Sequence, residues 1–337
     1  MRDFIKDVNK TQYNSIDLVK FIMAFAVIAI HTCPLNHCKN EIVLAIYDNI
    51  VNLAVPFFFL ASGYLLSKKI TFSDEVEDIY VIKKYMWKIL KMYLLWMAIY
   101  TPISIYHTLE MQISFTQAIR EYLQGLIFIG QQYNSWPLWY LLSTLYTLGI
   151  IIILIKLKTS INGLLVMSFI FSIISIGISG MVNIQDASKW IEIVQKIISY
   201  TVYNGRIFRG MIFLPVGIYL GHKKQHAKRW GMIMIAGFIL NCVVKNFVVS
   251  SYLLIFTSIG FFEVIANLDL KEHPAYYMCR KMSLILYLIH MYIWSIYYKV
   301  VYGVKTHGWD SFIITSVLGC VLAFAYLKFK DGYQRKR

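Results

Sequence analysis

Long apolar runs separated by short polar segments dominate the sequence. Each run has about 18 residues or more, which at a rise of 1.5 Å per residue is enough to cross about 30 Å of hydrocarbon. This pattern predicts a bundle of membrane-spanning helices. We expect ten of them, over 16–35, 42–66, 89–106, 137–156, 162–180, 205–222, 229–246, 248–268, 281–301 and 310–327.

Composition supports an all-α polytopic membrane protein. The 337 residues are 58% hydrophobic and 15% charged, whereas a soluble domain carries about 25% charged residues. The formal charge of +15 could indicate a nucleic-acid partner. However, the basic residues lie in short clusters between apolar runs rather than in one basic domain, so we expect no nucleic acid.

The distribution of Lys and Arg predicts the orientation. Of 33 such residues, 23 fall on the side that holds the N-terminus, 7 on the opposite side and three within spans. Because short cytoplasmic loops carry the excess of positive charge, we predict a cell-membrane protein with both termini cytoplasmic. Residues 1–15 would form a short cytoplasmic leader, and 328–337 a cytoplasmic tail.

Two segments outside the predicted spans have an amphipathic pattern. Residues 79–91 on the inner side and 115–129 on the outer side are each expected to lie along the membrane interface. Neither is expected to span. No linker or repeat divides the chain, so we expect 1–337 to form one membrane domain without a soluble catalytic domain. The first helix has no cleavage site at its end and is expected to stay in the membrane.

Polar groups within the first helix share one face. Asp17, Lys20 and His31 form a stripe, because at 100° per residue the step from 17 to 31 drifts by only about 40°. His31 lies about 22 Å beyond Ile16 along the axis, in the outer third of the bilayer. A histidine there can accept and return a proton near neutral pH, or it can simply hydrogen-bond to another helix. We interpret Asp17 and Lys20 as a structural pair.

Glu263 and His290 are two further titratable groups within predicted spans. His290 lies near the middle of its span, and Glu263 lies towards the inner end of its own. Ionisable groups in this setting usually mark a pathway or a site. Each could be a proton relay or a packed, satisfied polar group.

Two basic clusters are candidate binding sites. Arg206 and Arg209 open the sixth span from the outside, where guanidinium groups at a helix N-terminus could bind an anion or a carbonyl, or could snorkel to the interface. Lys84, Lys88 and Lys91 present cations at i, i+4 and i+7 on the helix that enters the third span. That face could hold anionic membrane lipid or the phosphates of a soluble cofactor.

Cysteine and histidine cluster after the first helix. His31, Cys33, His37 and Cys38 lie within eight residues, but their spacing is not a recurrent zinc pattern, and we expect no metal. Cys33 and Cys38 could form a disulfide in an oxidising exterior or remain reduced.

Taken in order, several segments resemble the acyltransferase-3 family of membrane acyltransferases. They are most similar to the membrane half of VanT-type membrane-bound serine racemases. The first helix resembles the family's opening D-x-x-R/K helix, which closes with histidine. The segments that carry the resemblance are Ser15–Phe25, Ala29–His31, Val55–Tyr64, Lys84–Trp96, Trp136–Leu141, Asn204–Gly205 with Pro215 and Gly217, and Ser283–His290.

The chain also departs from the family pattern. Tyr85 stands with Lys88 where two basic residues three apart are common, and Lys84 could substitute for the missing charge. Tyr203 stands where the family's R-N-G segment has arginine, so Arg206 or Arg209 would take that role. Pro137 replaces a histidine often found between the tryptophan and the leucine of its segment.

The resemblance implies transfer of an acyl group, in particular acetyl, from cytoplasmic acyl-CoA to a hydroxyl or amine of an envelope glycan or lipid. His31 would be the general base or a transient acyl carrier. The arginines would stabilise an oxyanion. The alternative is a carrier for serine or another small solute. The implied catalytic residues are His31, Arg206, Arg209 and His290, and the implied acyl-CoA contacts are Lys84, Lys88 and Lys91.

Overall fold

The computed structural model describes residues 13–185, 188–223 and 226–334, and this part of the chain is helical without a β-strand. Most of the predicted leader, 1–12, and the last three residues of the predicted tail lie outside the described residues. The helices are α2 (Asn14–Thr32), α3 (Glu41–Asn52), α4 (Ala54–Ser67), α5 (Glu75–Glu110), α6 (Phe115–Gln124), η1 (Gly125–Ile129), η2 (Trp136–Leu138), α7 (Trp139–Lys156), α8 (Gly163–Val182), α9 (Lys189–Thr201), η3 (Arg206–Phe208), α10 (Arg209–His222), α11 (Ala227–Val243), α12 (Phe247–Ala266), α13 (Pro274–Val301) and α14 (Trp309–Gln334).

Eight helical stretches among the described residues are long and apolar enough to cross a membrane, so the chain is a multi-pass membrane protein. They match eight of the ten predicted spans. The other two predictions, 205–222 and 229–246, correspond to η3 with α10 and to α11. At 17 residues, α11 is about 26 Å long, which falls short of the hydrocarbon thickness. The eight stretches are Asn14–Thr32, Glu41–Ser67, Glu75–Glu110, Trp136–Lys156, Gly163–Val182, Phe247–Ala266, Pro274–Val301 and Trp309–Lys330.

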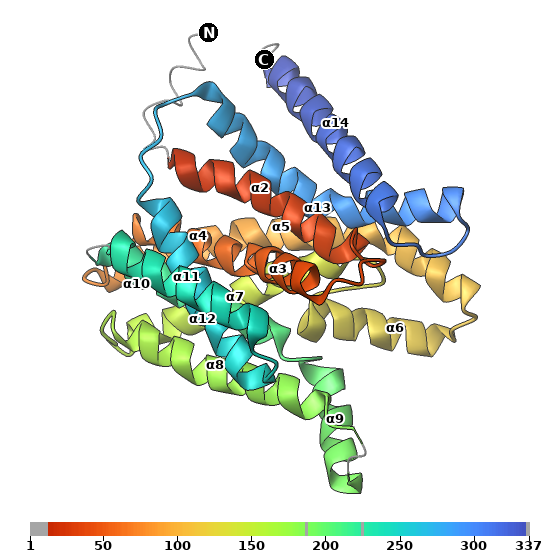
Figure 1. The fold of residues 1–337 in the computed structure, drawn as a ribbon, viewed down its shortest axis with the longest axis horizontal. Helices are drawn as coiled ribbons and strands as arrows, with labels where there is room; N and C mark the ends of the chain where they lie inside the picture. Colours follow the sequence, from red (N-terminus) through yellow and green to blue (C-terminus); the bar gives the residue numbers. More distant parts are fainter. Residues whose placement is uncertain (1–12, 186–187, 224–225, 335–337) are drawn as a thin grey trace.

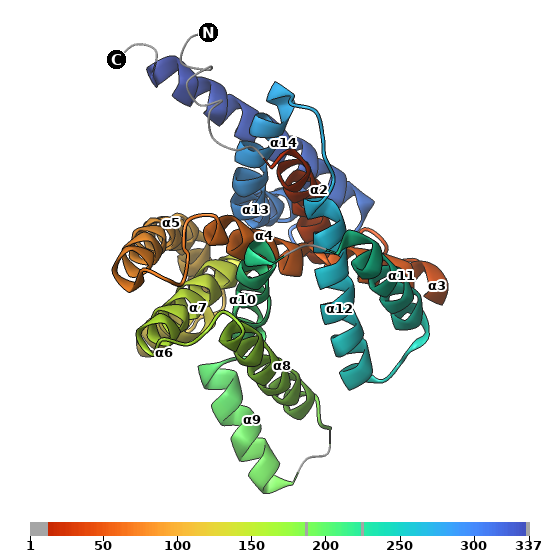
Figure 2. The ribbon, with the colours of Figure 1, turned by 90° about the vertical axis from the view of Figure 1, so that its left-hand side faces the viewer.

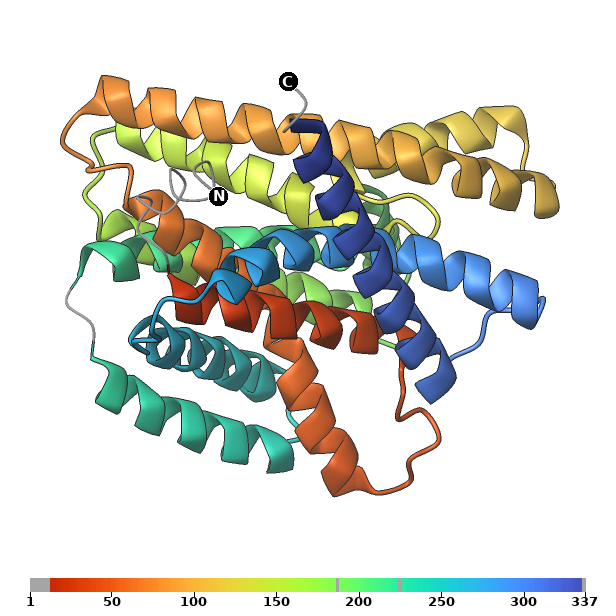
Figure 3. The ribbon, with the colours of Figure 1, turned by 90° about the horizontal axis from the view of Figure 1, so that it is seen from above.

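The third span is longer than predicted. Residues 79–91, which we expected to lie along the membrane interface on the helix that enters the third span, lie in the first half of the continuous helix α5 (Figure 3). The 36 residues of α5 give it a length of about 54 Å. Its start is fixed by Asp78, whose carboxylate accepts from the backbone N–H groups of Thr71 and Phe72 at 2.8 and 2.7 Å.

Two amphipathic helices meet on the side that we predict to be outer. The predicted segment 115–129 is α6 followed by the π-helical turn η1. Helix α9 was not predicted, and it carries exposed apolar side chains including Trp190 and Ile197. Gln124, at the end of α6, donates to the carbonyl of Tyr200 in α9 at 2.8 Å. Figure 2 shows α9 at the edge of the bundle, below α8.

Helices α4 and α10 lie near the centre of the bundle and pack with their backbones in close contact (Figure 2). Gly63 of α4 faces the Leu214 carbonyl of α10, and a Cβ at position 63 would lie 2.0 Å from that oxygen. Conversely, a Cβ at Gly217 of α10 would lie 2.2 Å from the Leu60 carbonyl of α4. Only glycine allows this approach, as is common where membrane helices associate.

Helices α2 and α13 run side by side in the same direction (Figures 1 and 3). Their predicted inner ends are joined by an ion pair between Asp17 and Arg280, with Arg280 Nη1 and Asp17 Oδ2 3.6 Å apart. The charge of Lys20, the expected partner on the same helix, also interacts with the Asp17 carboxylate. The polar stripe of α2 faces α13, so a cation on the neighbouring helix is the partner at ion-pair distance.

Replacing Gly63 or Gly217 by alanine should destabilise the protein, because either Cβ would force the backbones of α4 and α10 apart. We expect the free energy of unfolding to fall by roughly 1 to 3 kcal/mol or more. Gly149 of α7 is the matched control, because a Cβ there meets nothing within 4 Å. Gly149→Ala should change stability by less than about 1 kcal/mol. Thermal unfolding in detergent measures the stability of all three variants. If the Gly63 and Gly217 variants melted at the same temperature as the Gly149 variant, the close contact between α4 and α10 would not contribute to stability.

Candidate functional site

Two histidines from different helices meet near the predicted outer side of the bundle. The rings of His31, at the end of α2, and His290, on α13, stack with centroids 5.3 Å apart and an interplanar angle of 28°. His290 is completely buried, and His31 is partly buried. The structure therefore joins two of the sequence-predicted site residues that lie 259 positions apart.

Hydrogen bonding assigns different roles to the two nitrogens of His290. Nδ1 lies 3.1 Å from the carbonyl oxygen of Leu286. Since a carbonyl only accepts, Nδ1 carries the proton, and in a neutral imidazole Nε2 is then an acceptor. Among the described residues, Nε2 is buried without a hydrogen-bond partner. The pair thus contains an unused proton acceptor in a site shielded from water.

Trp136 and Lys305 cover the histidine pair. The ring of Trp136 lies 5.5 Å from that of His31, and Lys305 Nζ lies 4.3 Å from the Trp136 ring centroid. The loop that carries Lys305 is held to the end of α2, because the Gly308 N–H donates to the Thr32 carbonyl at 2.9 Å. Partial burial lowers the pKa of the Lys305 ammonium from its usual value.

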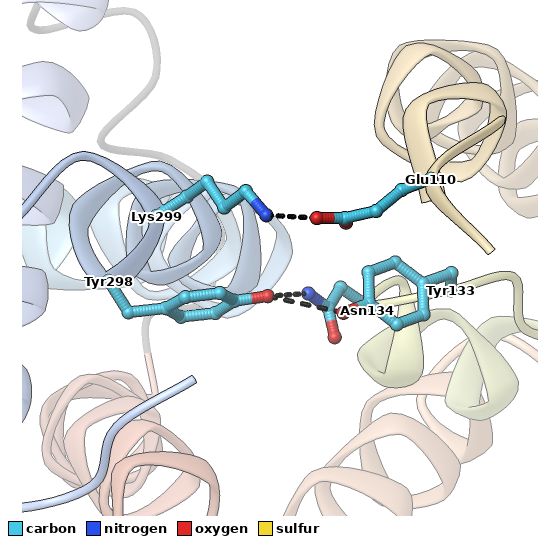
Figure 4. A network of polar contacts seen from close by, with 5 residues as sticks. All are labelled: Glu110, Tyr133, Asn134, Tyr298 and Lys299. Carbon is cyan, nitrogen blue, oxygen red and sulfur yellow. Dashed lines mark hydrogen bonds and ion pairs between the residues drawn. The ribbon is translucent and has the colours of Figure 1, made fainter. Parts of the chain in front are cut away.

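A polar network holds the loop before Trp136 in place (Figure 4). The amide of Asn134 donates to Ser295 Oγ at 3.0 Å and to Tyr298 Oη at 2.7 Å, both on α13. Beside this contact, Lys299 of α13 pairs with Glu110 at the end of α5. The network ties α5, α13 and the loop together and so fixes the approach of Trp136 to His31.

Arg206 is the arginine that lies beside this site. Its guanidinium donates to Gln131 and lies 5.5 Å from the Trp139 ring centroid and 4.9 Å from that of Tyr203. Its Nε is buried and has no partner among the described residues. The charge of Arg206 is close enough to interact with His31. Arg209 lies one turn along the same helical stretch with an exposed side chain.

Aromatic side chains lie on the predicted inner side of the histidine pair. The ring of Tyr287, one turn before His290, lies 5.5 Å from that of Tyr140 and 5.4 Å from that of Phe58. Tyr287 Oη donates to the Pro137 carbonyl at 2.9 Å, and Tyr140 Oη shares a 2.8 Å hydrogen bond with Ser62 Oγ. A packed aromatic layer therefore separates the histidines from the inner half of the bundle.

The three candidate lysines lie away from the histidines. Lys84, Lys88 and Lys91 are exposed on one face of α5. Farther along α5, Tyr100 Oη donates to the Leu288 carbonyl at 2.8 Å, two residues before His290. The 12 residues between Lys88 and Tyr100 correspond to about 18 Å of helix, so these lysines and the histidines lie at different depths.

The remaining candidate residues, Glu263, Cys33 and Cys38, have no contact with the histidine pair that indicates a functional role. Glu263 is buried in α12, and its Oε2 accepts from the Asn267 amide at 3.3 Å, which fits a packed polar group. Cys33 and Cys38 are both free thiols. In the part of the chain that the structure describes, no group of three or more His, Cys, Asp or Glu side chains could hold a metal ion.

Lys305 and Gln131 were not predicted as site residues. Lys305 counted only as a charge in an outer loop, and Gln131 lies in a polar stretch without a motif. Their contacts depend on loops that return to the ends of distant helices. The sequence did contain one indication of a cation near the site. Several tryptophans and tyrosines lie at the ends of these helices, and such rings can bind a cation.

The comparisons agree with the resemblance noted above. The acyltransferase-3 family, described as Acyltransferase domain, matches residues 13–328. A protein named Amino-acid racemase from Enterococcus faecalis is 28% identical over 281 residues, which cover 83% of this chain and 37% of that protein. A Serine/alanine racemase from Enterococcus gallinarum is 26% identical over 298 residues, covering 82% of this chain and 40% of that protein. The chain thus spans less than half the length of these relatives. No solved structure matches.

Proposed function

The chain belongs to the acyltransferase-3 family, and we propose that it moves an acyl group, in particular acetyl, from cytoplasmic acyl-CoA to an acceptor on the outer side. The acceptor is a hydroxyl or amine of an envelope glycan or a lipid. The single observation that carries the proposal is the stacked pair of His31 and His290 beside the Arg206 guanidinium. This arrangement places a proton acceptor and a cation together in a covered site.

His31 performs the proton transfer in this proposal. An alcohol is a poor nucleophile until its proton is removed, so the imidazole takes the proton while the alcohol oxygen attacks the thioester carbonyl. The tetrahedral intermediate then collapses, the carbon–sulfur bond breaks, and the proton passes to the leaving CoA thiolate. In the two-step variant, a ring nitrogen of His31 attacks the thioester carbonyl and the carbon–sulfur bond breaks to release the CoA thiolate. The acceptor oxygen then attacks the acyl-imidazole, the carbon–nitrogen bond breaks, and the acceptor's proton is taken up by the released imidazole.

Arg206 and His290 support that chemistry. The negative charge on the carbonyl oxygen grows in the transition state, and a preorganised cation shielded from water stabilises it strongly. Arg206 is held by Gln131 and by two aromatic rings, so its position is fixed before the substrate arrives. His290 packs against the His31 ring and orients it, with its own ring held by the Leu286 carbonyl.

The donor would bind at the cytoplasmic start of α5. Lys84, Lys88 and Lys91 form a cationic face there, and the exposed Trp87 beside them suits a membrane interface. The same face can also hold anionic lipid headgroups. In our proposal the phosphates of acyl-CoA bind at this level, and the acyl end of the molecule extends towards the histidines.

A solute carrier is the second candidate function. It is favoured by the two relatives, whose names describe racemases of amino acids and which extend well beyond the matched region. In that case the membrane domain would supply serine or a similar solute without chemistry. The site would then bind the solute, and the histidines would not change any covalent bond.

Replacement of His31 tests the catalytic proposal. General acid–base catalysis contributes about 10²- to 10⁴-fold, so His31→Ala and His31→Gln should each lower acetyl transfer by at least about 100-fold. Gln can hydrogen-bond but cannot shuttle a proton near neutral pH. The measurement is transfer of radioactive acetyl groups from acetyl-CoA to the envelope of cells that express each variant. His222→Gln, an identical change on α10, is the control and should keep activity.

The outcomes separate the two candidate functions. Near-normal transfer by His31→Gln would make the histidine structural. If neither the wild type nor any variant modified an acceptor, while labelled serine still entered proteoliposomes, the carrier would be the correct function.

The two arginines provide a second test. Removing one oxyanion donor typically costs about 10²- to 10³-fold in kcat, so Arg206→Gln should reduce the rate of transfer by that factor. Arg209→Gln should reduce it by less than about tenfold, because its side chain is exposed. Equal losses in both variants, or a larger loss at Arg209, would exclude the assigned role of Arg206.

Charge reversal at Lys84, Lys88 and Lys91 tests the donor site. The triple glutamate variant should bind CoA more weakly, and the difference should be larger at low salt, where screening is weakest. Binding is measured on purified protein by isothermal titration calorimetry. Glutamate at Lys156 and Lys158, which lie at the predicted inner end of α7 and beyond it, is the control. If the triple variant bound CoA with unchanged affinity, the lysines would not bind the donor, and contact with anionic lipid headgroups would be their remaining role.

A further inference from the structure

A separate pocket opens between α3, α11 and α12, and none of its lining residues belongs to the histidine site. Its volume is about 510 Å³, which falls within the usual range for small-molecule sites. The polar side chains that line it are Glu41, Asp48, Asn49, Asn52, Asn241, Lys245 and Ser250.

The floor of the pocket is a built hydrogen-bond chain across three helices. Ser250 Oγ of α12 donates to Asn241 Oδ1 at 2.7 Å, and the Asn241 amide donates to Asn49 Oδ1 on α3. The Asn49 amide in turn donates to Cys242 Sγ at 3.4 Å. Asn49 is 6% exposed. These groups satisfy one another, so the floor is rigid and has little capacity left for a ligand.

The two acidic side chains of the pocket differ in their pairing. Glu41, at the rim, lies 3.8 Å from Lys245 Nζ. Asp48 lies about two turns farther along the same face of α3. It is exposed towards the pocket, and its carboxylate makes no hydrogen bond or ion pair with any described residue. Next to it, the Asn52 amide donates to the backbone carbonyl of Asp48 at 2.8 Å, which leaves the Asn52 side-chain oxygen free as an acceptor. The pocket therefore presents a negative charge and an acceptor to its occupant.

The rest of α3 places the pocket at the edge of the bilayer. Val43, Ile46 and Ile50 are exposed and point away from the pocket lining, as expected for side chains in contact with lipid. Glu41 and Lys245, both exposed, mark the opening at the predicted outer side. An occupant can therefore reach the pocket from the aqueous exterior or from the outer leaflet.

We propose that this pocket binds a primary ammonium group flanked by oxygen substituents on neighbouring carbons. The ammonium would pair with the Asp48 carboxylate and donate a second hydrogen bond to Asn52, since an ammonium has three donors and no acceptor. The neighbouring oxygens would face the rim, where the Lys245 ammonium has donors left beside its contact with Glu41. A soluble amino sugar and an ethanolamine lipid headgroup both have this chemistry. The proposal depends on the pocket alone and not on acyl transfer.

Matched ligands test the ammonium requirement. Purified protein in phosphatidylcholine nanodiscs is titrated with glucosamine and with glucose, which differ at the amine, under conditions where the amine is protonated. Glucosamine should bind at least about tenfold more tightly, because a charge-assisted contact is lost with glucose. Asp48→Asn should abolish this preference, whereas Glu41→Gln, which removes the paired rim carboxylate, should preserve it.

Nanodiscs that contain phosphatidylethanolamine distinguish the two sources. Glucosamine binding that persists in these nanodiscs identifies a soluble amine as the occupant. Displacement by the lipid, with phosphatidylethanolamine retained in native mass spectrometry by the wild type and lost from Asp48→Asn, identifies the headgroup. Equal affinity for glucose and glucosamine, an unaltered preference in a folded Asp48→Asn variant, or no amine binding in any nanodisc would overturn the proposal.

Discussion

The close contact between α4 and α10 is the constraint on which the rest of the bundle depends. In lipid there is little hydrophobic force between helices, so their association depends on packing and hydrogen bonds. Gly63 and Gly217 let each backbone enter the surface of the other helix. This contact fixes α10, whose first turn follows directly from Arg206, and it fixes α4, whose Ser62 hydroxyl meets Tyr140. The position of the candidate site therefore depends on a backbone contact whose own residues take no part in catalysis.

Tyrosine hydroxyls connect the helices around that centre. Tyr47, Tyr100 and Tyr287 each donate to a backbone carbonyl of another segment, at 2.8, 2.8 and 2.9 Å. A hydroxyl within hydrocarbon must find a partner, and each of these bonds meets that need while it sets the spacing between two segments. Two of the carbonyls, at Ala29 and Leu288, lie two residues from His31 and His290. These hydrogen bonds thus fix the two helices that carry the stacked histidines.

The sequence predicted the spans because the length of an apolar run is a local property. It did not predict contacts between residues that are distant in sequence, because these form only in the folded structure. Residues 79–91 are amphipathic, which indicates an interfacial position, and they form one uninterrupted helix with the third span because nothing in their sequence breaks the helix. The contact of Asp17 with Arg280 was not predicted, because Arg280 is far away in sequence. His31 and His290 were singled out as candidates from their depth in the predicted spans and from the family motifs, and the structure places their rings together. Lys305 was not, because its contact with Trp136 exists only after the loop closes on α2.

The aromatic layer between the lysines and the histidines constrains any mechanism. A donor bound at Lys88 lies about 18 Å of helix from the level of Tyr100, and Tyr287, Tyr140 and Phe58 fill the space below the histidine pair. The polar, phosphate-bearing part of acyl-CoA is excluded from such a layer by the cost of burying charge. If the proposed donor is acyl-CoA, only its narrow, uncharged pantetheine and acyl end would reach His31 from the inner side. Within the proposed function, the two-step variant with a transient acyl-histidine would meet this constraint most simply, since donor and acceptor would then never need to occupy the site together.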